Sequence, residues 1–268
     1  MKQPLIALIS ILLYLSSAGM IAVRLFRREH PRLPPRQFAL ALAFGGLLMH
    51  TWLLYQHIFA PTGLNLAFFN ALSLASWTVV ASLLVPSLTK PVENLGIVLL
   101  PVAALTIALD AMFPNIGFMS PEASWILKLH VLLSMLAYSL LTIASVQAIL
   151  LAVQDHYLRA RQPGGFIRSL PPLMTMEAML FEMISVGFVL LTLALISGLA
   201  FLENMFDQHL VHKTVLSAVA WLVFGSLLLG RKLWGWRGRK AIIWTLSGFA
   251  LLILAYFGSK LVLEIILN

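Results

Sequence analysis

Histidine is the side chain whose chemistry is most informative in this sequence. Five of the seven histidines lie within long apolar segments or at their ends: His50, His57, His130, His209 and His212. His50 and His57 are seven residues apart, nearly two turns, so a helix would place them on one face. Neutral imidazole is a good iron ligand, and an iron porphyrin needs one or two axial ligands. The pattern favours haem ligation as one hypothesis and interfacial hydrogen bonding of each histidine as the alternative.

The segments that carry these histidines are long enough to cross a membrane. The chain is 60% hydrophobic and 10% charged, with a mean hydropathy of +0.95, whereas charged residues make up about a quarter of a soluble domain. An α-helix of about 20 apolar residues crosses the hydrocarbon core. We therefore predict an all-α fold: a polytopic membrane helix bundle of about eight transmembrane helices, forming a single transmembrane domain over residues 1–268. The expected spans are approximately 4–23, 37–59, 66–85, 95–113, 125–154, 176–201, 212–230 and 241–265.

Basic residues between the apolar segments predict the orientation in the membrane. Fourteen of the 18 lysines and arginines lie at 24–36, 90, 159–168 and 231–240. Loops rich in Lys and Arg stay in the cytoplasm, so both termini are expected outside. Charge follows the first segment instead of preceding it, so we expect a retained helix, not a signal peptide. By this topology His57, His130, His209 and His212 share an outer depth, and His50 lies deeper.

Composition also limits the classes of function. The absence of cysteine excludes a disulfide, a thiolate metal site, a thioether link to haem and a Cys redox pair. The positive-inside rule accounts for the net charge of +8, and the basic loops are too short for a nucleic-acid-binding domain. We therefore expect contacts with the lipid bilayer and other membrane proteins, and no nucleic acid. No paired carboxylates, phosphate-binding glycine loop or nucleophile–base signature is present, so we expect no catalytic residues and no enzyme activity.

Several motifs resemble the cytochrome c assembly family of integral membrane proteins, most closely its YpjD-type inner-membrane members. LHVLLSMLAYS at 129–139 is similar to the family helix whose histidine is an outer axial haem ligand. GFVLLT at 187–192, followed by ISG at 196–198, is similar to a second helix of the family. Trp221, followed by GWRGRK at 235–240, is similar to a third span of the family and the loop after it. Residues 69–77 are similar to the family helix that follows the first membrane histidine. His50 is therefore the counterpart expected for that histidine.

This resemblance implies a multi-pass protein of the bacterial inner (cytoplasmic) membrane that handles haem in cytochrome c-type biogenesis. His130 would be an axial ligand to a non-covalent, b-type haem, with His50 as a deeper ligand. No metal other than this haem iron is expected.

The chain also departs from the family pattern. The Trp-rich outer motif of haem-handling members is replaced at 210–215 by LVHKTV, which keeps only the lysine. Leu229 stands where the family has its second membrane histidine. The family's second outer histidine, expected near the C-terminus, has no counterpart, because no histidine follows His212. By depth alone, His57, His209 or His212 could replace a lost outer ligand. The alternative function is a non-haem accessory protein that keeps the family fold and docks on another membrane protein, such as a transporter, through its basic cytoplasmic loops.

Overall fold

The computed structural model describes most of the 268 residues of the chain. The described residues are 2–26, 35–60, 63–65, 67–113, 118–119, 125–161, 167–168, 170–201 and 208–258.

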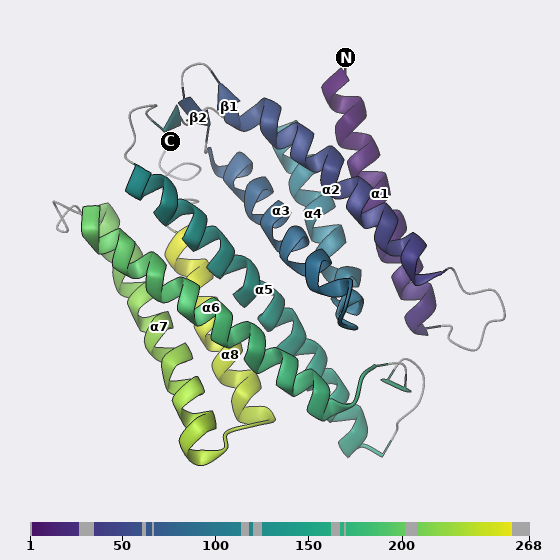
Figure 1. The fold of residues 1–268 in the computed structure, drawn as a ribbon, viewed down its shortest axis with the longest axis vertical. Coiled ribbons are helices and arrows are strands. Elements are labelled where there is room, and N and C mark those ends of the chain that lie inside the picture. Colours follow the sequence, from purple (N-terminus) through teal and green to yellow (C-terminus); the bar gives the residue numbers. More distant parts are fainter. Residues whose placement is uncertain are drawn as a thin grey trace. The chain divides into compact units, whose positions relative to one another are not determined.

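Eight long helices form the described part of the chain (Figure 1). Each is long and apolar enough to cross a membrane, and a helix satisfies its own backbone hydrogen bonds where lipid offers no partners. The prediction of an all-α bundle with about eight membrane-spanning helices is confirmed. The helices are α1 (Lys2–Phe26), α2 (Arg36–Ile58), α3 (Phe68–Ser87), α4 (Gly96–Met112), α5 (Trp125–Arg159), α6 (Leu173–Phe201), α7 (Gln208–Trp234) and α8 (Arg239–Ile253).

Short irregular elements join these helices. A 3₁₀ turn, η1 (Glu93–Leu95), leads into α4, and a π-helical turn, η3 (Leu254–Gly258), continues α8. Three strands of two or three residues, β1 (Phe59–Ala60), β2 (Gly63–Asn65) and β3 (Phe118–Met119), pair antiparallel in the order β1-β2-β3. Leu64 of β2 pairs with Phe59 on one side and Met119 on the other. The sequence analysis does not predict this small sheet, which is too short to change the fold class.

Contacts within the chain divide it into two compact units. Unit 1 comprises residues 1–122 and 163–171, and unit 2 comprises residues 123–162 and 172–268. Unit 1 therefore holds α1 to α4 with the three strands, and unit 2 holds α5 to α8. The single transmembrane domain predicted from the sequence stays a prediction.

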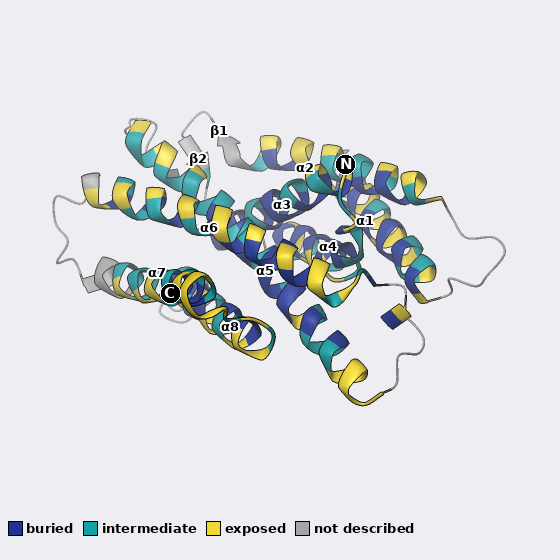
Figure 2. Ribbon diagram, turned by 60° about the horizontal axis from the view of Figure 1, so that its bottom comes forward, coloured by how far each residue is buried: buried dark blue, intermediate teal, exposed yellow. Residues whose placement is uncertain are grey.

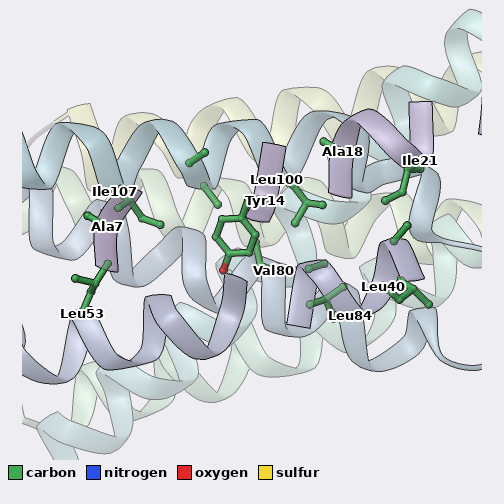
Figure 3. Close-up of a cluster of buried hydrophobic side chains, with 14 residues drawn as sticks. Ala7, Tyr14, Ala18, Ile21, Leu40, Leu53, Val80, Leu84, Leu100 and Ile107 are labelled. Atoms are coloured by element: carbon green, nitrogen blue, oxygen red, sulfur yellow. The ribbon is translucent and has the colours of Figure 1, made fainter. Parts of the chain in front are cut away.

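Unit 1 is built around a buried tyrosine. α1 packs against α2 and α4, and α3 packs against α2 and α4. The Tyr14 ring of α1 is fully buried within a cluster of apolar side chains (Figure 3). Gly46 of α2 leaves room for this ring, because a Cβ there would lie 2.6 Å from Tyr14 Cδ1. Ser10 and Ser17 of α1 donate hydrogen bonds to the carbonyls of Gly46 and Ala39 at 3.0 and 2.7 Å. Small residues and interhelical hydrogen bonds of this kind hold membrane helices together.

Unit 2 uses the same packing devices on different helices. α5 packs against α6 and α8, and α7 packs against α6 and α8. A Cβ at Gly248 of α8 would lie 2.8 Å from the Phe224 ring of α7, so this glycine permits the close approach of the two helices. Trp221 of α7 stacks on Phe188 of α6, with ring centroids 5.5 Å apart, and its Nε1 donates to Thr192 Oγ1 at 2.8 Å.

Burial follows the helical period in both units. Figure 2 shows exposed and buried residues recurring along most of the helices, whereas α3 is mostly buried or intermediate. Many exposed side chains are large and apolar, such as Leu48, Val85 and Trp125, each more than 60% exposed. Such surfaces are stable when lipid covers them.

Candidate functional site

His130 lies near the start of α5 and is oriented by α6. Its Nδ1 is 2.8 Å from the carbonyl oxygen of Ala194 and 3.2 Å from Ser197 Oγ. A carbonyl oxygen only accepts, so Nδ1 carries the proton and Nε2 of the neutral ring carries the lone pair. The Ser134 hydroxyl lies 3.5 Å from Nε2, at the long limit for a hydrogen bond. The contacts of Nδ1 therefore fix the tautomer in which the lone pair on Nε2 is the one that could bind a metal.

A glycine of α6 provides the space for the His130 ring. A Cβ at Gly198 would lie 3.0 Å from His130 Cε1, which is closer than side chains normally pack. Ser197 and Gly198 are the last residues of the ISG sequence that resembles the family motif. The structure gives this sequence a physical role, since one residue contacts Nδ1 and the next accommodates the ring.

His50 occupies a different environment in unit 1. The residue is fully buried, and its Nε2 lies 2.9 Å from Ser73 Oγ of α3. Its Nδ1 lies 3.3 Å from the Tyr14 hydroxyl of α1, and the two rings meet edge to face. Both ring nitrogens thus take part in hydrogen bonds that link α1, α2 and α3. Iron ligation by His50 would require one of these bonds to break.

His57 lies at the end of α2 and pairs with a carboxylate from α4. Its Nδ1 is 2.9 Å from Asp110 Oδ2. The Asp110 side chain is only 8% exposed and the His57 side chain 26% exposed. Sequence reasoning placed His57 by depth but missed Asp110 as its partner. The available signal was an acid near the end of the fourth apolar segment, at the same expected depth as His57.

The other outer histidines predicted from the sequence lie at the start of α7. The backbones of His209 and His212 belong to this helix, but their side chains lie outside the described residues. His50 and His57 share α2 in unit 1, whereas His130 belongs to unit 2. Among the residues that the structure describes, no three His, Cys, Asp or Glu side chains come together to hold a metal ion.

A glutamate of α6 is buried, with partners that no spacing in the sequence indicates. Glu177 of α6, with a side chain 4% exposed, accepts from Arg231 Nη1 at 2.7 Å and from the Gly238 amide at 3.0 Å. The Arg231 guanidinium also lies 3.9 Å from the centroid of the Phe181 ring. Gly235 and Gly238 have φ of +64° and +57°, values that favour glycine. Glu177 thereby ties the turn formed by GWRGRK to α6 through a charge-assisted hydrogen-bond network.

Comparison with known proteins decides the family. Residues 40–267 match the family model described as cytochrome C assembly protein. The chain belongs to the cytochrome c assembly protein family. Inner membrane protein YpjD of Escherichia coli K12 is 34% identical over 276 residues, which cover 98% of this chain and all of the relative. The chain is accordingly a multi-pass protein of the bacterial inner membrane.

More distant relatives carry a functional name. Cytochrome c biogenesis protein CcsA of Microcystis aeruginosa is 25% identical, over 72% of this chain and 75% of the relative. CcsA of Prochlorococcus marinus strain MIT 9515 is 26% identical, over 79% of this chain and 75% of the relative. These matches support a role of the cytochrome c biogenesis type.

Proposed function

We propose that this protein binds haem without covalent attachment and presents it during cytochrome c-type biogenesis, with His130 as an axial ligand. Membership in the cytochrome c assembly family supports this role, as does similarity to proteins named for cytochrome c biogenesis. The observation that carries the proposal is the hydrogen bond from His130 Nδ1 to the Ala194 carbonyl. Metal-ligating histidines characteristically donate their other ring N–H to a carbonyl or carboxylate, which fixes the ring and the tautomer.

Each residue around His130 has a defined part in this role. His130 Nε2 would ligate the iron, the Ala194 carbonyl and Ser197 hydroxyl orient the ring, and Gly198 leaves room for it. Haem supplies iron that already carries four porphyrin nitrogens, so one imidazole is enough to hold it. The function is coordination and presentation of haem, without a catalytic residue in this chain. The basic loops would lie in the cytoplasm and His130 near the outer face of the membrane.

His50 enters this proposal as a second, deeper ligand. Its two hydrogen bonds, to Tyr14 and Ser73, hold the ring in the core of unit 1. Ligation through Nε2 would replace the bond to Ser73, while the contact with Tyr14 could remain. Haem binding by His130 does not depend on this exchange.

The experiment for this proposal is an absorption spectrum of detergent-purified protein from cells with ample haem. The intact protein should show a Soret band, and His130→Ala should lose or weaken it. His156→Ala is the matched control, because His156 lies on the same helix but is exposed at its far end. Equal spectra for the protein and His130→Ala, with equal helical content, would contradict the role of His130.

A non-haem accessory role is the second candidate. The engagement of both His50 ring nitrogens favours it, because a buried histidine can be retained for packing after a cofactor is lost. The exposed side chains of Trp234 and Arg237 would then belong to a docking surface for another membrane protein. Replacing Arg237 and Arg239 by alanine should disrupt co-purification with that partner. A colourless, well-folded protein that keeps this partner would favour the accessory role.

A further inference from the structure

A buried carboxylate at one end of unit 1 has a single described partner. Asp110 of α4 contacts His57 of α2 at 2.9 Å, and its side chain is 8% exposed. An ionisable group inside a membrane bundle is costly, and such groups usually serve a function. Unit 1 already joins its helices through neutral groups, as in the bonds from Ser10 to Gly46 and between Ser76 and Thr106. The contact between His57 and Asp110 differs from these bonds because it joins two ionisable side chains.

The pair sets the chemistry of the His57 ring. A carboxylate accepts, so Nδ1 carries a proton that it donates to Asp110, and the neutral ring keeps its lone pair on Nε2. Among the residues that the structure describes, none forms a hydrogen bond with this Nε2. His50, seven residues earlier on α2, differs because hydrogen bonds engage both of its ring nitrogens. In metal-ligating histidines, the ring nitrogen that does not bind the metal commonly donates its proton to a carboxylate or a carbonyl. His57 has this arrangement, because Nδ1 donates to Asp110 and Nε2 is the nitrogen left to bind a metal.

The number of available ligands limits which metal this histidine can take. A bare transition-metal ion needs three or four protein ligands, and the described part of the chain holds no group of three His, Cys, Asp or Glu. A porphyrin brings four ligands and needs one or two more. The end of α4 is also apolar, with Met112 69% and Phe113 50% exposed, and Phe113 stacks on Phe69 of α3. These features suit a flat, largely apolar ligand such as an iron porphyrin.

We infer that Asp110 is a positioning residue that holds His57 as an axial ligand for haem iron at this end of unit 1. The inference rests on the proposed haem-handling function and adds an imidazole that the family resemblance does not provide. Asp110 orients the ring, fixes its tautomer and makes Nε2 a stronger electron donor. A stronger donor stabilises ferric over ferrous iron, so this carboxylate should lower the reduction potential of the bound haem.

The test is a haemin titration of the intact, detergent-purified protein, followed by absorption, electron paramagnetic resonance and redox potentiometry. His57→Gln is the decisive variant, because its amide can still bond to Asp110 while it cannot serve as an imidazole ligand. We expect it to change the ferric resonance spectrum and weaken haemin binding. Asp110→Asn should keep His57 as ligand, raise the reduction potential and weaken haemin binding by about 10- to 100-fold. Gln56→Ala, an exposed neighbour on α2, should match the parent protein.

The outcomes separate this inference from the proposed function. One outcome is that the Soret band depends on His130, while His57→Gln has the same ferric resonance spectrum, haemin affinity and reduction potential as the parent protein. This outcome would overturn the inference and leave the proposed function in place. Dependence on His57 without dependence on His130 would support the inference and remove the role of His130. Absence of haemin binding by the parent protein would overturn both. Circular dichroism of each variant establishes that the helices are intact.

Discussion

His130 Nδ1 lies 2.8 Å from the carbonyl oxygen of Ala194. This hydrogen bond between α5 and α6 decides which ring nitrogen of His130 holds the lone pair. The bond also explains why the segment at 194–198 matters, since Ser197 lies 3.2 Å from the same nitrogen and Gly198 accommodates the ring. The orientation of the proposed iron ligand is thus encoded in a neighbouring helix, α6, and not in α5 alone.

Replacing Gly198 by alanine should displace the His130 ring. The new Cβ would lie 3.0 Å from His130 Cε1, so the ring must shift and its bond to the Ala194 carbonyl must lengthen. We expect weaker haemin binding and a shifted Soret band, measured by titration of purified protein. Gly19→Ala on α1 is the control, because no heavy atom lies within 4 Å of the position that its Cβ would occupy. Equal binding by Gly198→Ala and Gly19→Ala would contradict the positioning role of Gly198.

Replacing Ser73 by alanine separates the structural role of His50 from a ligand role. The change leaves His50 Nε2 without its 2.9 Å hydrogen bond, which should lower the free energy of unfolding by roughly 0.5–2 kcal/mol. Thermal unfolding in detergent measures this loss. If His50 also ligates iron, the freed Nε2 should bind haemin more tightly. Lower stability with unchanged haemin affinity would assign His50 to packing alone.

Two adjacent glycines of α2 should differ sharply in tolerance. A Cβ at Gly46 would lie 2.6 Å from the Tyr14 ring, whereas a Cβ at Gly45 would lie 3.6 Å from Leu13 Cδ1. Gly46→Ala should therefore lower the free energy of unfolding by about 1–3 kcal/mol through overpacking. Gly45→Ala should be neutral or slightly stabilising, because alanine favours helix. Equal unfolding temperatures for the two variants would show that Tyr14 is not packed against Gly46.

The orientation in the membrane can be tested by thiol labelling, since the natural chain has no cysteine. Lys128 and Arg239 are both exposed and lie at opposite predicted faces. By the positive-inside rule, Lys128→Cys should react with a membrane-impermeant maleimide in spheroplasts. Arg239→Cys should react only after the membrane is opened. The reverse pattern would place both termini inside and move His130 to the cytoplasmic side.

The membrane-spanning helices were predictable from the sequence because each depends on a local property. A run of about 20 apolar residues forms a helix in lipid whatever its neighbours are. Asp155, His156 and Arg159 continue the fifth span with a composition typical of a helix, and α5 accordingly continues to Arg159, beyond the span end at 154. Charged residues near the interface extend a helix without adding to the apolar signal.

The partners of the histidines were not predictable, because they depend on which helices pack together. Asp110 lies 53 residues from His57, and Ser73 lies 23 residues from His50. Neither spacing has a sequence signature. The resemblance to family motifs drew attention to His130, but only the packing of α5 on α6 identifies the Ala194 carbonyl as its partner. The partners of Glu177 were not predictable for the same reason, since its contact with Gly238 joins residues 61 apart.

The most direct test of the haem-handling role is a pair of oxidised and reduced absorption spectra of the purified protein and His130→Ala. We predict a Soret band with a reduced spectrum typical of non-covalent haem, lost or weakened in the variant while helical content is kept. A colourless parent protein with intact helices, purified from cells with ample haem, would contradict the haem-handling role and leave the accessory role as the explanation of the retained fold.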